Sequence, residues 1–258
     1  MTEALQRLRA SLGAYPKLVV AVSGGVDSLT LATVAAQVVP DFSVAHAVSP
    51  AVPKPATDRV RQFAHQQGWK LHVIDAGEFK NPDYLKNPIN RCYYCKSNLY
   101  KRIAETCAGP IAAGTNTDDL GEYRPGLIAA SENQVLHPYL DAQISKMELR
   151  IIASELGLSD IADLPAQPCL ASRIETGIAV TEEDLVFAFQ MEELARSHGL
   201  RGNVRCRITR KGVKLETSEI AGTSLMDAVK LNCTESGRKF AGHAPYQRGS
   251  AFVGPASL

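Results

Sequence analysis

Apolar residues recur along the chain with two different spacings, and these spacings predict its helices and strands. Residues 3–13 place Leu5, Leu8 and Leu12 on one face, which is typical of an amphipathic helix. Further helices are predicted at 26–38 and 145–156, and another contains Leu99, Ile103 and Ala104. Two more have a threonine N-cap: one runs from Thr57 to Gly68, and the other from Thr181 to about Ser197. Apolar runs predict strands at 17–23, 42–48, 71–75, 110–113 and 135–140.

Strands and helices alternate in the first part of the chain. This order is typical of an α/β fold, in which helices cover both faces of a parallel sheet and ligands bind at the carboxyl ends of the strands. Residues 163–180 are irregular, and beyond them a helix and a hairpin of residues 204–209 and 212–217 predict a small α+β domain. We therefore expect one domain over residues 1–165 and a second over residues 166–258.

Composition and charge narrow the possible functions. The 258 residues carry 28 basic and 27 acidic side chains, and the net charge of +1 lacks the basic footprint of a protein that grips a long stretch of nucleic acid. The sequence contains neither a transmembrane run nor the apolar core of a signal peptide, so we expect a cytoplasmic protein without a membrane partner. In that reducing compartment the six cysteines are expected as ligands, nucleophiles or core residues.

A glycine-rich segment follows the first predicted strand and precedes a predicted helix. Such a turn offers backbone N–H groups to phosphate, and its glycines let the backbone approach an anion closely. Asp27 would repel phosphate unless Mg²⁺ lay between them, so the segment predicts a site for a metal-bound nucleotide. The spacing is neither that of Walker A nor that of a dinucleotide fingerprint, and the alternative is a simple Ser/Gly turn. The candidate ATP-binding residues are Ala21, Ser23, Gly24, Gly25, Asp27 and Ser28.

A second polar segment, residues 114–119, follows the predicted strand at 110–113. Beside a nucleotide loop, Thr115 and Asn116 would hold ribose or adenine, and Asp118 or Asp119 would hold Mg²⁺ through oxygen. The alternative is a polar strand-to-helix loop with an aspartate cap. The candidate ATP-binding residues in this segment are Gly114, Thr115, Asn116 and Asp119.

Three cysteines stand out from the other three. Cys92 and Cys95 are spaced to present two thiolates to one metal centre, and their basic neighbours favour thiolate over thiol. Cys169 lies in a polar, proline-containing loop that does not suit a core cysteine. A redox pair or a zinc site are the alternatives for this set. The remaining three, Cys107, Cys206 and Cys233, are expected as core residues.

Basic residues cluster between positions 196 and 214. Arg205 and Arg207 alternate along a predicted strand, share one face and can form a phosphate clamp. The alternative is a hairpin face that is simply solvated. Nearby acidic residues would pair with these arginines or hold a metal, and they are Glu192, Glu193 and Glu216.

Four motifs occur in an order that resembles the LarE family of ATP-dependent sulfur transferases. They are SGGVDS at 23–28, NRCYYCK at 90–96, GTNTDD with the following EYRPG at 114–126, and PCLASRI at 168–174. SGGVDS alone resembles the PP-loop of ATP pyrophosphatases, and the match to LarE spans roughly residues 15–215. The resemblance implies a Rossmann-like parallel sheet of the adenine nucleotide alpha hydrolase type.

The resemblance to LarE also implies a reaction and its residues. ATP with Mg²⁺ would adenylate a carboxylate of pyridinium-3,5-biscarboxylic acid mononucleotide, and a sulfur nucleophile would convert it to a thiocarboxylate for the nickel-pincer nucleotide. The substrate phosphate would bind Arg205, Arg207 and Arg173. Cys92, Cys95 and Cys169 would hold a [4Fe-4S] cluster that carries the sulfur, since three thiolates leave one iron open. The alternative within the family is a sacrificial sulfur donor using Cys169 for a single turnover.

Other functions remain as alternatives. A tRNA thiolase shares the loop and similar cysteines but needs a broad basic surface, so a nucleic-acid partner is not expected. An amide-forming synthetase would not need the three cysteines, and a non-enzymatic ATP-binding module is the third alternative. The resemblance also implies a homo-oligomer, and the source of sulfide is unknown.

Overall fold

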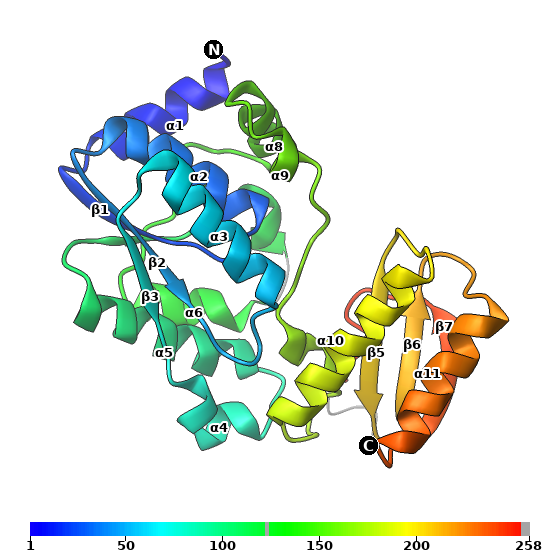
Figure 1. Ribbon diagram of the computed structural model, residues 1–258. Coiled ribbons are helices and arrows are strands. Elements are labelled where there is room, and N and C mark those ends of the chain that lie inside the picture. The colour runs from blue at the N-terminus through cyan, green and yellow to red at the C-terminus, as the bar shows by residue number, and fades with distance from the viewer. Residues whose placement is uncertain (122–123, 254–258) are drawn as a thin grey trace. The chain divides into compact units, whose positions relative to one another are not determined.

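The computed structural model describes residues 1–121 and 124–253 and divides the chain into two compact units. The first unit comprises Met1–Lys80 and Cys92–Gln167, and the second comprises Asn81–Arg91 and Pro168–Leu258. Each unit has its own sheet (Figure 1). The α/β fold with a parallel sheet and a small additional sheet near the C-terminus is confirmed.

The sheet of the first unit has four parallel strands in the order β3-β2-β1-β4. Val20 in the central strand β1 stands beside Val44 in β2 and Ala112 in β4. Because all four strands run in the same direction, their carboxyl ends share one edge of the sheet, where ligands bind in folds of this kind. The strands are β1 (Lys17–Ala21), β2 (Asp41–Ala47), β3 (Leu71–Ile74) and β4 (Ile111–Ala112).

Helices cover both faces of this sheet (Figure 1). Leu18 and Val20 of β1 join one hydrophobic core, whereas Val19 between them joins another on the opposite face, as the alternation of side chains in a strand requires. The first core includes residues of α1 (Glu3–Gly13), α2 (Val26–Val38), α3 (Lys54–Gln67), α7 (Pro138–Asp141), α8 (Lys146–Glu155) and α9 (Ser159–Ala162). The second core includes residues of α5 (Arg91–Thr106) and α6 (Pro125–Glu132).

Two local predictions were wrong. Thr57 does not cap α3, because Pro53 is the N-cap and the fixed φ of Pro55 in the first turn suits a helix start. The strand expected at 135–140 is reduced to an isolated bridge between Ala112 and Leu136, since Pro138 starts the short helix α7 two residues later. The helix predicted at 145–156 is present as α8, and Ser145 is its N-cap and forms a capping box with Glu148.

The second unit packs two helices on one face of a three-stranded sheet. Strand β5 (Val204–Thr209) and strand β6 (Gly212–Thr217) form the predicted antiparallel hairpin, and β7 (Phe240–Pro245) runs parallel to β6. Helices α10 (Glu182–Ser197) and α11 (Thr223–Glu235) pack on it around the buried thiols of Cys206 and Cys233. Cys107 is buried in the first unit, so the prediction of three core cysteines is confirmed.

Residues 81–91, which contain the short helix α4 (Pro82–Leu85), are bound within the second unit. The buried side-chain amide of Asn87 donates to the carbonyl of Glu175 at 2.9 Å, and the carbonyl of Asn87 accepts from Gly177 N at 2.9 Å. Asn87 has a φ of 53°, a left-handed conformation that asparagine tolerates better than most residues. The segment that immediately precedes Cys92 in the sequence is therefore hydrogen-bonded to residues that follow Cys169 in the sequence.

Over the described stretches, no helix combines the length and apolar character needed to cross a membrane.

Candidate functional site

The nucleotide loop, residues 23–28, joins the carboxyl end of β1 to the start of α2. Gly24 has a φ of +82°, and a Cβ atom on it would lie 2.6 Å from the carbonyl oxygen of Ala56. The Ser28 hydroxyl accepts from Ser23 N at 3.0 Å and donates to the Gly25 carbonyl at 3.2 Å. These bonds fix the shape of the loop, while the glycines keep side chains away from the N-terminus of a 13-residue helix. A helix start of this kind suits a phosphate group.

Helix α3 and strand β2 support the loop from the side. The Arg59 guanidinium donates to the Gly24 carbonyl at 2.8 Å. His46 is buried, and its Nδ1 donates to the carbonyl of Val22 at 2.8 Å while its Nε2 accepts from the Thr57 hydroxyl at 2.9 Å. Burial lowers the pKa of His46, which keeps the ring neutral and able to make both bonds.

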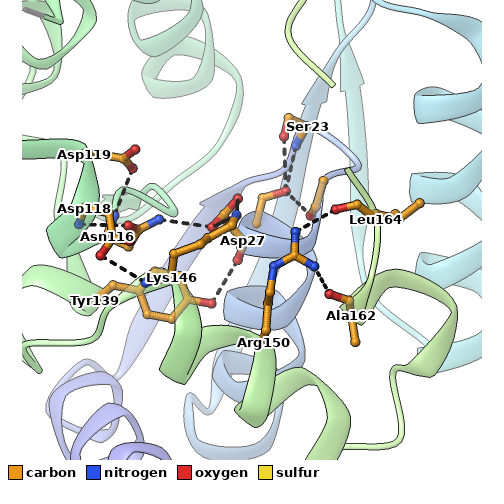
Figure 2. A network of polar contacts seen from close by, with 12 residues as sticks. Ser23, Asp27, Asn116, Asp118, Asp119, Tyr139, Lys146, Arg150, Ala162 and Leu164 are labelled. Atoms are coloured by element: carbon orange, nitrogen blue, oxygen red, sulfur yellow. Dashed lines mark hydrogen bonds and ion pairs between the residues drawn. The ribbon is translucent and has the colours of Figure 1, made fainter. Parts of the chain in front are cut away.

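Asp27 is the centre of a polar network at the start of α2 (Figure 2). The Lys146 ammonium contacts its two carboxylate oxygens at 2.6 and 2.5 Å, and the Asn116 amide donates to one of them at 3.1 Å. The Tyr139 hydroxyl donates to the Asp27 carbonyl at 2.9 Å, and burial, followed by the charge of Asp27, raises the pKa of this phenol far above its usual range. Tyr139 therefore stays protonated as a donor.

Residues 114–119 lie against this network. A Cβ atom on Gly114 would lie 3.1 Å from both the carbonyl carbon of Asp27 and the nitrogen of Ser28, so glycine permits the two loops to touch. Asp119 accepts from Asn116 N at 3.1 Å and pairs with Arg124 at 2.7 Å. The structure thus brings together Ser23, Gly24, Gly25, Asp27, Ser28, Gly114, Thr115, Asn116 and Asp119, next to Ala21 at the end of β1. Glu122 and Tyr123 of the matched motif lie outside the described residues.

The three candidate cysteines occupy the two units. Cys92 and Cys95 lie in the first turns of α5, three positions apart, so that both thiols share one face of the helix. Both are partly exposed, and Cys169 in the second unit is exposed. Among residues 1–121 and 124–253, no group of three His, Cys, Asp or Glu side chains is arranged to hold a metal ion.

Arg205 and Arg207 project from one face of β5 and are both buried. The alternative of a solvated hairpin face is therefore wrong for these two side chains. Arg207 pairs with Glu216 at 2.9 Å, and Arg205 lies over the ring of Tyr246 with 5.6 Å between the guanidinium carbon and the ring centre. Burial lowers the pKa of Arg205, and the neighbouring charges of Arg173 and Arg207 lower it further. Three guanidinium groups so close together favour an anion nearby.

Two buried carboxylates balance this positive charge. Glu216 accepts from Lys214 at 2.9 Å, from Ser250 at 2.8 Å and from Arg207, and these bonds outweigh burial and lower its pKa. Glu192 pairs with Arg173 at 2.8 Å. The expectation that acidic residues pair with the arginines of residues 196–214 is confirmed for Glu216 and, at 3.8 Å on the surface, for Glu193 with Arg196, whereas Glu192 pairs with Arg173 outside that stretch.

Sequence reasoning missed Lys146, Arg59 and Tyr139. The position of Lys146 could have indicated its role, because Lys146 is the first residue of α8 and a cation is disfavoured at a helix N-terminus. Such a position suggests a partner outside the helix, here Asp27. Arg59 and Tyr139 carried no such signal, since an arginine or a tyrosine in a helix has many ordinary roles.

Comparison with known proteins finds relatives that cover most of the chain. No family model matches the sequence. An uncharacterized protein of Synechocystis, slr1717, is 37% identical over 217 residues, which are 82% of this chain and 80% of the relative. An uncharacterized protein of Methanocaldococcus jannaschii, MJ0830, is 29% identical over 195 residues, 74% of this chain and 73% of that protein. The pyridinium-3,5-bisthiocarboxylic acid mononucleotide synthase of Lactiplantibacillus plantarum is 27% identical over 219 residues, 82% of this chain and 78% of the synthase.

Proposed function

Since the chain belongs to the same family as slr1717 and is related to the synthase of Lactiplantibacillus plantarum, we propose that it is an ATP-dependent sulfurtransferase. The substrate would be a carboxylate of pyridinium-3,5-biscarboxylic acid mononucleotide, and the product a thiocarboxylate for nickel-pincer nucleotide biosynthesis. The observation that carries the proposal is the nucleotide loop with Asp27 and Lys146 at its end. The name of the synthase supports the choice of substrate.

The first step would take place at the nucleotide loop. The carboxylate oxygen would attack the α-phosphorus of ATP, and pyrophosphate would leave with the electron pair of the broken P–O bond. The N-terminus of α2 and the Lys146 ammonium would stabilise the charge that develops on the phosphates. Mg²⁺ fits this site because Asp27 and Asp119 supply carboxylate oxygens, and when bound it would neutralise phosphate charge. Lys146 would then exchange Asp27 for a phosphate oxygen.

The phosphate of the mononucleotide would bind at the arginine face of β5. Arg205 would offer guanidinium donors, and arginine binds phosphate through two parallel hydrogen bonds. Arg207, on the same side of the strand, already donates to Glu216 and to the carbonyls of Ser172 and Gln247, so it would contribute its positive charge. Glu192 and Glu216 keep the charge of this region balanced before the substrate arrives. A local group of arginines balanced by buried carboxylates suits a small anionic substrate. Such a local group is compatible with a net charge of only +1 on the whole chain.

The second step would transfer sulfur to the adenylated carboxylate. A sulfur nucleophile would attack the carbonyl carbon, and AMP would leave. Cys92 and Cys95, which share a helix face, would hold a [4Fe-4S] cluster together with the exposed Cys169, since three thiolates leave one iron open. When bound, such a cluster would supply a removable sulfide at its fourth iron. The exposed Cys169 also suits the second possibility, a protein that gives up its own sulfur once.

One experiment tests the reaction and separates the two sulfur routes. Protein purified without oxygen is given ATP, Mg²⁺ and the biscarboxylic acid mononucleotide, and pyrophosphate and product mass are measured. We expect pyrophosphate release, a product in which sulfur has replaced one oxygen, and about four iron atoms per chain that are lost in Cys92→Ser. Product without iron, with a dehydroalanine in place of Cys169, would establish the single-turnover route. No pyrophosphate release would contradict the proposed function.

A further inference from the structure

Arg173 lies four residues after Cys169 and is buried, with about 5% of its side chain exposed. Its three guanidinium nitrogens all donate within the second unit. Nε and Nη2 contact the two oxygens of Glu192, each at 2.8 Å. Nη1 donates to the carbonyl of Pro168 at 2.8 Å and to that of Cys169 at 3.3 Å. The side chain therefore spans from helix α10 to the backbone of the cysteine loop, residues 168–172.

We propose that Arg173 positions the cysteine loop for sulfur transfer and does not bind the substrate phosphate. The inference rests on the proposed sulfurtransferase function and reassigns a residue that the resemblance places with the phosphate ligands. A phosphate at Arg173 would have to displace Glu192 or the two loop carbonyls. Displacing Glu192 would leave a buried carboxylate without its cation, which is strongly unfavourable.

Other contacts show that the loop is held as a unit. Glu192 also accepts from the backbone nitrogen of Cys206 at 2.9 Å, so the pair ties the edge strand β5 to the cysteine loop. Arg207 donates to the carbonyl of Ser172 at 3.0 Å, and Ser172 N donates to the carbonyl of Cys169 at 3.0 Å. Cys169 itself stays exposed at the end of this framework.

The electrostatics agree with this assignment. Burial alone would lower the pKa of Arg173, but the hydrogen bonds and charge of Glu192 reverse this and raise it, with a smaller contribution from Cys169. Arg173 is thus a permanent cation inside the second unit, close to the thiol and to the two loop carbonyls. Arg205 differs in its partners, since it lies over Tyr246, donates to the carbonyl of Val204 at 2.7 Å and has both Arg173 and Arg207 among its charged neighbours.

A loose cysteine loop would leave the first step intact and impair the second. The adenylated carboxylate would form, and water would hydrolyse it before a poorly placed sulfur could attack. Misplacement of a reacting group by a small distance can reduce a rate by about 100-fold. Uncoupling of pyrophosphate release from thiocarboxylate formation is therefore the signature of a positioning residue.

The test compares Arg173→Lys with Arg205→Lys. Lysine keeps the cation beside Glu192 but cannot donate to the carboxylate and both carbonyls together. For Arg173→Lys we expect an unchanged KM for the mononucleotide in pyrophosphate release, and about a 10- to 100-fold lower yield of thiocarboxylate per pyrophosphate. Arg205→Lys should instead raise that KM about tenfold or more. Arg210→Lys is the matched control, since Arg210 pairs with Glu175 on the surface and should leave both quantities unchanged.

Hydrogen–deuterium exchange supplies a readout that does not depend on the reaction. Arg173→Lys should speed exchange in residues 168–174 and leave the β5–β6 hairpin as in the wild type, whereas Arg210→Lys should change neither segment. Unchanged exchange in residues 168–174 together with a raised KM would overturn the inference and make Arg173 a phosphate ligand. If no pyrophosphate is released by the wild type, the proposed function fails, and the exchange data still decide whether Arg173 holds the loop.

Discussion

The nucleotide loop of the first unit and the arginine face of the second both present groups that suit an anion, but in different ways. The loop relies on backbone: glycines, a helix N-terminus and one ion pair between Asp27 and Lys146 whose side chains are about a third exposed. The arginine face relies on side chains that are almost fully buried and already paired, such as Arg207 with Glu216. A site of the first kind can lose function without losing stability, and one of the second kind cannot.

The largest expected effect is a loss of folding stability when an arginine of the arginine face is replaced. Arg207→Met would leave Glu216 buried with less compensation and would remove donors from the carbonyls of Ser172 and Gln247. We expect the free energy of unfolding to fall by about 3–5 kcal/mol, measured by urea denaturation. The control is Arg102→Met, which removes a surface pair with Glu105 and should cost less than about 1 kcal/mol. Equal losses for the two variants would contradict the contrast.

Gly24→Ala should produce the next largest effect, on ATP binding. Alanine is strained at a φ of +82° by about 1–2 kcal/mol, and its Cβ would collide with the Ala56 carbonyl. We expect the Kd for ATP, measured by calorimetry, to rise by about 30-fold or more as the loop moves away. Gly13→Ala, with nothing within 4 Å of the added carbon, is the control and should bind ATP normally. Tight ATP binding by Gly24→Ala would refute the role of the loop.

Lys146→Met should separate function from stability. Its pair with Asp27 is about a third exposed, so its loss should change the free energy of unfolding by less than about 1 kcal/mol. The KM for ATP in pyrophosphate release should rise about tenfold because a phosphate contact is lost. Lys54→Met removes the exposed pair with Asp58 and should leave the KM unchanged. A stability loss as large as that of Arg207→Met would show that Lys146 is a structural residue.

The smallest effect is expected from pH acting on His46. Its pKa is lowered by burial, so the unfolded chain binds a proton that the folded chain does not. The resulting stability is complete above the unfolded pKa of about 6.5 and is lost as the pH falls from there through the folded pKa. His46→Gln should flatten the decline of Tm below this pH, whereas a substitution of the exposed His198 should not. The same slope in all three proteins would contradict the prediction.

The contrast between the two regions also explains what the sequence could reveal. The nucleotide loop was predictable because glycines and a strand-to-helix order encode it locally, within residues 21–28. Strand alternation predicted that Arg205 and Arg207 share a face, and Glu216 was expected as an acidic partner, but their burial and their other contacts were not predictable. Those contacts are with Ser172, Tyr246 and Gln247, which the fold brings in from distant parts of the chain. The Lys146 contact with Asp27 was missed for the same reason, since 119 positions separate them.

The most direct test of the central claim is Cys169→Ser assayed for both steps at once. In the proposed function the nucleotide loop activates the carboxylate and Cys169 takes part in sulfur transfer. We therefore expect the variant still to release pyrophosphate from ATP and the mononucleotide while forming no thiocarboxylate. Thiocarboxylate at the wild-type level would show that Cys169 is not required and would contradict the account.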